Sequence, residues 1–116
     1  MNTERFLCVG ETAVSAVDER GAGHANHEYR VYANKDGAPL AEISFQNGPI
    51  LENGVNGIQN EDLLMIVIDR LIGFQTGEFE CAENAEALEL LVSACAQLNL
   101  RTALRKARNV EGKSEK

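Results

Sequence analysis

Three arginines near the end of the chain have the spacing that a phosphate-binding site needs. Arg101, Arg105 and Arg108 are four and three residues apart, so on a helix they share one face. A guanidinium offers a planar fork of N–H donors that can grip a phosphate or pyrophosphate, and it also stacks on purine rings. The alternative is a solvated helix end, where the cations complement the helix dipole. The spacing by itself leaves both interpretations open.

A second group of candidate residues lies upstream, around an expected link between two helices. Phe74 and Phe79 belong to the stretch 73–80, where they serve either in packing the helical hairpin or as a platform on which a base stacks. Asn84 lies near the start of the following helix. It is either a local helix cap or a reader of the hydrogen-bonding edge of a nucleobase.

The sequence offers little for catalysis or for a metal. The motifs GxSxG, HExxH and GxxxxGK[ST] do not occur. His24 and His27 are three apart, but in a stretch expected to lead from a loop into a strand. Cys8, Cys81 and Cys95 are an odd number with wide spacing, which favours small buried side chains over a disulfide framework or metal knuckle. We therefore expect no catalytic residue, no metal and no cofactor.

Composition limits the class of protein further. The 116 residues are 44% hydrophobic and 25% charged, which is typical of one globular domain. A net charge of −7 disfavours DNA or RNA as a partner. No apolar run is long enough for a membrane span, and the polar N-terminus precedes no signal-peptide core. We expect a cytoplasmic protein without a membrane partner.

The charge is distributed unevenly along the chain. Residues 1–98 hold five basic and sixteen acidic side chains, whereas residues 99–116 hold six basic and two acidic ones. An anion site should therefore draw on the C-terminal stretch.

The sequence pattern predicts an α+β fold to position these residues. A small N-terminal antiparallel β-sheet, recognised by its hairpin, is followed by a two-helix hairpin with one long helix. Alternating residues 27–33 and 39–45, joined by the turn signal NKDG, predict the β-hairpin. Residues 11–17 fit either a strand or a short helix, and the fold of residues 1–26 stays open. The glycine-rich stretch 46–57 is either a plain connection or a lip over a ligand.

The helical part has a length mismatch. The first helix is expected from an N-cap at Asn60 to a stop at Gly73, apolar nearly all round and so buried on several sides. The second is expected over about residues 80–108, with an apolar stripe. The members of this stripe are Ala85, Leu88, Leu91, Val92, Cys95, Leu98 and Thr102. The longer helix would span about 40 Å, more than the shorter one can cover, so we expect self-association through the long helix.

Self-association would also join the two groups of candidates. Asn84 and Arg101 are about 25 Å apart along one helix, so they cannot hold one small ligand within a chain. Long helices running antiparallel across a two-fold axis would bring Phe74 and Asn84 of one chain beside Arg101 and Arg105 of the other. We expect one domain with a β-rich part (1–57), an αα-hairpin (58–112) and a frayed tail (113–116).

Five stretches carry a resemblance to a known family. They are FQNGP (45–49), GVNGIQNEDLLMIVIDRL (54–71), GFQTGEF (73–79), ECAENAEAL (80–88) and RTALRKARNVEG (101–112). In this order they resemble the helical hairpin that phage Thoeris anti-defence sponges share with the related anti-CBASS sponges of phages. The N-terminal hairpin fits the Thoeris branch better.

The resemblance implies a phage protein, not an enzyme, that sequesters a nucleotide immune signal in the cytoplasm of the infected or lysogenic host. Its ligand would be a cyclic ADP-ribose isomer, with cyclic oligonucleotides at separate sites in some members. The assembly would be a homodimer, with a hexamer as a trimer of dimers. Phe74 resembles the adenine-stacking residue, Asn84 a polar contact, and Arg101 and Arg105 the pair that grips base and pyrophosphate. Further candidates are Gln46, Asn47 and Asn56 in the loops, and Arg108.

Two other hypotheses remain. A small homo-oligomeric adaptor with no nucleotide ligand would also account for the long helix and the acidity, with the arginines as surface residues. An enzyme that degrades a cyclic nucleotide would need a base or metal that the sequence does not display.

Overall fold

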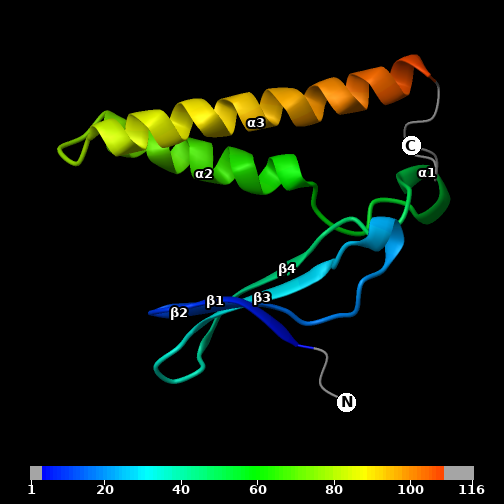
Figure 1. Ribbon diagram of the computed structural model, residues 1–116, viewed down its shortest axis with the longest axis horizontal. Helices are drawn as coiled ribbons and strands as arrows, with labels where there is room; N and C mark the ends of the chain where they lie inside the picture. The colour runs from blue at the N-terminus through cyan, green and yellow to red at the C-terminus, as the bar shows by residue number, and fades with distance from the viewer. Residues whose placement is uncertain (1–3, 109–116) are drawn as a thin grey trace. The chain divides into compact units, whose positions relative to one another are not determined.

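The computed structural model describes residues 4–108, which form two compact units. The boundary between the units along the chain lies between residues 58 and 59. The first unit contains strands β1 (Arg5–Val9), β2 (Thr12–Ala16), β3 (Glu28–Ala33) and β4 (Pro39–Ser44), with a 3-10 turn at Ala22–His24 and a short helix α1 at Ile50–Asn53. The second contains helices α2 (Asn60–Gln75) and α3 (Ala82–Ala107) (Figure 1). The expected α+β class is confirmed. The predicted end of the helical part at residue 112 and the tail 113–116 lie outside the described residues.

The strands form one antiparallel sheet in the order β1-β2-β3-β4. The predicted hairpin is β3 and β4, and its turn places Gly37 at φ +72°, a conformation that favours glycine. Residues 12–16 form a strand and not the alternative short helix. Strand β1 was not predicted, because its sequence RFLCV shows no alternation of polar and apolar residues.

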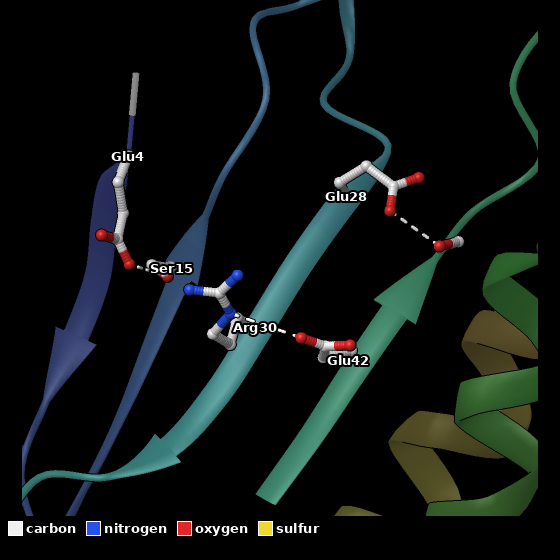
Figure 2. Close-up of polar contacts among 6 residues, drawn as sticks. Glu4, Ser15, Glu28, Arg30 and Glu42 are labelled. Carbon is white, nitrogen blue, oxygen red and sulfur yellow. Dashed lines mark hydrogen bonds and ion pairs between the residues drawn. The ribbon is translucent and has the colours of Figure 1, made fainter. Parts of the chain in front are cut away.

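The two faces of the sheet differ in character. On one face, register stacks Ala16, Tyr29 and Ile43 across three strands, and the Tyr29 ring meets that of Phe45 edge-on with centroids 5.6 Å apart. The other face carries a ladder of polar pairs (Figure 2). These are Ser15 Oγ to Glu4 at 2.6 Å, Arg30 to Glu42 at 3.7 Å and Ser44 Oγ to Glu28 at 2.7 Å. Opposite charges and hydroxyls across neighbouring strands support this register.

Helix α2 differs from its predicted bounds at both ends. Gln59, and not Asn60, is the N-cap: its backbone N–H donates to Asp62 Oδ2 at 2.8 Å within a capping box. At the other end the helix passes through Gly73 and ends at Gln75. A glycine inside a helix costs about 1 kcal/mol but need not end it. The N–H of Thr76 closes the last turn on Ile72 and Gly73.

Helices α2 and α3 form an antiparallel hairpin along a regular seam (Figure 1). Apart from Ala87, the buried and half-buried positions of α3 step alternately by four and three residues, as in coiled coils. They are Asn84, Leu88, Leu91, Cys95, Leu98, Thr102 and Arg105. Most of the predicted stripe is confirmed, but Ala85 and Val92 are exposed because they fall beside this seam.

The two helices differ in length, as expected. Helix α3 has 26 residues and α2 has 16, so α3 extends about 15 Å beyond its neighbour. The expectation that α2 is buried on several sides is wrong for the single chain: Ile68 is its buried residue, while Met65 and Ile66 are 56% and 57% exposed. One neighbouring helix can cover only one stripe of a cylinder. Within residues 4–108, no helix combines the length and apolarity that a membrane crossing requires.

Candidate functional site

The three arginines predicted from their spacing come together in the structure. Arg101, Arg105 and Arg108 line an open depression of about 300 Å³ on the C-terminal half of α3. Among residues 4–108, Leu100, Leu104 and Gln97 also line it and no carboxylate does, so the described lining combines cations with apolar surface. Such a surface suits a ligand with both a phosphate and a ring.

Burial separates the two interpretations of these arginines. Arg105 is only 7% exposed, so a solvated helix end does not describe it. Arg101 and Arg108 are exposed. Arg105 is therefore largely enclosed, while Arg101 and Arg108 beside it are exposed at the surface.

Phe74 lies in the last turn of α2 and not in the interhelical link, because the helix continues through Gly73. Its side chain is 40% exposed, and the guanidinium carbon of Arg70 lies 5.5 Å from the ring centroid. Phe79 does lie in the connection and is 70% exposed. An exposed ring at a helix end is a suitable surface for stacking a base.

Asn84 is the third residue of α3, and its side chain is half-buried. The cap of this helix is Cys81, whose Sγ accepts the backbone N–H of Asn84 at 3.4 Å. Within the described part of the chain, the Asn84 amide makes no hydrogen bond. The local-cap interpretation therefore does not apply, and the amide remains available as donor and acceptor.

A glutamine that the sequence analysis did not single out fixes this end of the hairpin. Gln75 Nε2 donates to the Cys81 carbonyl at 3.1 Å, and the Cys81 N–H donates to Gln75 Oε1 at 3.0 Å. This reciprocal pair joins the end of α2 to the start of α3. It therefore holds Phe74 and Asn84 at the same end of the hairpin. In the sequence, the one sign of this role is that Gln75 directly follows Phe74 and precedes the expected second helix by a few residues.

The structure keeps the two groups of candidates apart within one chain. Phe74 and Asn84 flank the connection between α2 and α3, whereas Arg101 and Arg105 lie in the last turns of the same α3. The axial rise of a helix places Asn84 and Arg101 about 25 Å apart. Each group is therefore at most part of a site for one small ligand.

The loop candidates of the first unit bond to one another. Gln46 Nε2 donates to the carbonyls of Gly48 and Gly54, and Gln46 Oε1 accepts the N–H of Asn56. The Asn56 side chain in turn accepts the N–H of Asn47 at 2.7 Å and donates to its carbonyl at 2.8 Å. The amides of Gln46 and Asn56 are thus engaged in holding the loop. Their observed role is structural.

The histidines and the nearby carboxylate form a structural cluster in the first unit. His27 is 7% exposed, and its Nε2 lies 3.0 Å from the carbonyl of Ala22. Burial tends to raise the pKa of Asp18, but hydrogen bonds from the His27 N–H and the Asn26 side chain outweigh this and lower the pKa below 3.8. Among residues 4–108, no group of three His, Cys, Asp or Glu side chains could hold a metal ion.

Comparison with known proteins gives two results. Residues 38–103 match the family model described as Acb2/Tad1, hairpin domain. A relative named Thoeris anti-defense 1, from Bacillus phage SBSphiJ7, is 46% identical over 94 residues, which cover 81% of this chain. The matched region covers 66% of the relative, just under two thirds of its length.

Proposed function

Because this chain belongs to the Acb2/Tad1 hairpin family, we propose that it is a phage anti-defence protein that sequesters a nucleotide immune signal. The ligand is a cyclic ADP-ribose isomer, bound without cleavage in pockets at a homodimer interface in the host cytoplasm. The relative from Bacillus phage SBSphiJ7, named Thoeris anti-defense 1, supports the anti-defence role.

The observation that carries this proposal is the arginine-lined depression on α3. In a chain with a net charge of −7, three arginines line one hollow, and no carboxylate of residues 4–108 lines it. A local cluster of cations on a negatively charged chain favours binding of an anion. Arginines favour phosphate in particular, because one guanidinium can donate two parallel hydrogen bonds to it. The leucines beside them add apolar surface for a base or ribose.

The size of the depression supports a shared pocket. About 300 Å³ is at the lower limit for sites that enclose a small molecule, and the hollow is open to one side. A dinucleotide-sized ligand held against it would remain largely in water. A second surface is needed, and Phe74 with Asn84 is the surface that carries a stacking ring and an unused amide.

A two-fold axis across antiparallel α3 helices would supply that second surface. The apolar side chains that the single chain leaves exposed on α3 would be buried there. Among them, Leu90 is 62% and Val92 51% exposed. The dimer would have two equivalent pockets, and three dimers would form a hexamer.

Sequestration requires recognition and no chemical step. Arginine, leucine and glutamine line the depression, and none of these side chains is a proton acceptor at neutral pH. Their arrangement can hold a pyrophosphate by charge-assisted hydrogen bonds, each contributing about 1.5–3 kcal/mol.

Titration calorimetry of two variants and a control tests the proposal. Arg101→Ala and Arg105→Ala should each weaken binding of a cyclic ADP-ribose isomer by at least about tenfold, since each removes a charge-assisted contact. Lys106→Ala removes a cation from the same turn that does not line the depression, so it should bind as the wild type does. Wild-type affinity in both arginine variants would contradict the proposal.

The exposed apolar side chains of α2 and α3 also favour a second candidate, a homo-oligomeric adaptor without a nucleotide ligand. Thermal-shift measurements with cyclic nucleotides separate the two, because a ligand that binds only the folded state raises its melting temperature. Stabilisation by a cyclic nucleotide supports the sponge, and stabilisation only by a protein partner supports the adaptor.

A further inference from the structure

Arg70 is an isolated cation in the acidic part of the hairpin. Residues 59–98 lie within the described part of the chain and contain one basic side chain, that of Arg70, against eight carboxylates. These carboxylates belong to Glu61, Asp62, Asp69, Glu78, Glu80, Glu83, Glu86 and Glu89. Most of the charged side chains in this stretch therefore repel an anionic ligand.

The position of the Arg70 guanidinium is unusual in such surroundings. Among residues 4–108 it makes no ion pair and no hydrogen bond, although acidic side chains are abundant nearby in the sequence. Its guanidinium carbon lies 5.5 Å from the ring centroid of Phe74, one helical turn further along α2. The ring holds the cation by a cation–π contact, while the N–H donors at the edge of the guanidinium remain unused.

Phe74 and Arg70 together offer the two surfaces that one nucleotide presents. Phe74 is 40% exposed, and the ring face away from Arg70 suits a base. The guanidinium over the other face suits a phosphoryl group of the same ligand. A carboxylate partner would have neutralised Arg70, and the aromatic partner leaves its charge available.

We propose that Arg70 binds phosphate in the Phe74 half of the pocket, donating to the phosphoryl group nearest the base that stacks on Phe74. This inference rests on the proposed function. It divides the ligand's charge between the two chains: Arg70 of one chain binds one phosphoryl group, and Arg101 and Arg105 of the other chain bind the next. The pocket thereby selects phosphorylated ligands over nucleosides.

The test compares Arg70→Gln with Arg30→Gln for binding of the cyclic ADP-ribose isomer that the wild type retains. Both variants lose one positive charge, and Arg30 lies in the sheet, paired with Glu42. Arg70→Gln should weaken binding about tenfold to a hundredfold and reduce its dependence on salt. Arg70→Lys, which keeps the charge but loses the fork, should recover part of the affinity. Equal affinity and salt dependence in Arg70→Gln and Arg30→Gln would overturn the inference.

A second pair of variants separates a direct contact from support of the ring. In a Phe74→Leu background, Arg70→Gln should still reduce the affinity and its salt dependence, since the phosphate contact does not require the ring. If the effect of Arg70→Gln disappears in that background, Arg70 acts only through Phe74 and the inference is wrong. A wild-type protein that binds no cyclic nucleotide would overturn the proposed function together with this inference. Binding that ignores Arg70 would overturn the inference alone.

Discussion

Leu90 and Leu91 are adjacent leucines of α3 that should respond differently to truncation. Leu91 lies in the seam with α2 and is half-buried, whereas Leu90 is 62% exposed in the single chain. Leu91→Ala leaves a cavity within the hairpin and should lower the free energy of unfolding by about 2 kcal/mol. Leu90→Ala removes little that the single chain buries. Its effect should appear only where a second chain covers α3.

The size of the Leu90 effect follows from its exposure. Burying a whole leucine side chain contributes about 1.5–3 kcal/mol, so burying the exposed 62% contributes roughly 1–2 kcal/mol for each chain. A two-fold dimer loses this contribution twice. The dimer dissociation constant should therefore rise about a hundredfold.

Sedimentation equilibrium over a range of protein concentrations, with urea unfolding, measures both effects. The wild type and Leu91→Ala should dimerise with similar dissociation constants, and Leu90→Ala should be monomeric at micromolar concentration. A monomeric wild type, or a Leu90→Ala variant that dimerises as tightly as the wild type, would refute the reasoning that α3 is the dimer contact.

Three further substitutions test local features of the fold. Gly73→Ala should stabilise the protein to urea unfolding by about 1 kcal/mol, because a Cβ there meets nothing within 4 Å and alanine favours the helix; a loss of stability would contradict this. Gly57→Ala should destabilise by about 1–3 kcal/mol, because its Cβ would collide with the Phe45 backbone; wild-type stability would show that the loop can shift. The lowered pKa of Asp18 makes its carboxylate stabilising above pH 3.8, an effect lost as pH falls through the folded pKa. In Asp18→Asn, the free energy of unfolding should therefore fall less as the pH is lowered through the acid range. An unchanged pH dependence would contradict the assignment.

The sequence alone predicted the elements whose signals are local. The NKDG turn with alternating flanks identified β3 and β4, and a long segment without glycine or proline identified α3. Strand β1 was missed because a short edge strand needs no alternation when both its faces are exposed. The end of α2 was misplaced because a helix tolerates Gly73 when the following residues can still close its last turn.

The candidate site was predictable where it depends on helical spacing. Arg101, Arg105 and Arg108 line one depression, as their separations of four and three residues indicated. The burial of Arg105 was not predictable, because it depends on what surrounds the end of α3. The involvement of Gln46 and Asn56 in their own loop also required coordinates, since glutamine and asparagine amides serve ligands and turns equally well.

The central claim, that the chain holds an intact cyclic nucleotide in a shared pocket, is tested most directly by retention and release. The protein is incubated with a cyclic ADP-ribose isomer, separated from free ligand by gel filtration, and heated, and the released material is analysed by chromatography. We expect the unmodified ligand, in an amount approaching one molecule per chain, because the proposed dimer would have two pockets. Recovery of a cleaved product, or of no nucleotide from a panel of cyclic ADP-ribose isomers and cyclic oligonucleotides, would contradict the account.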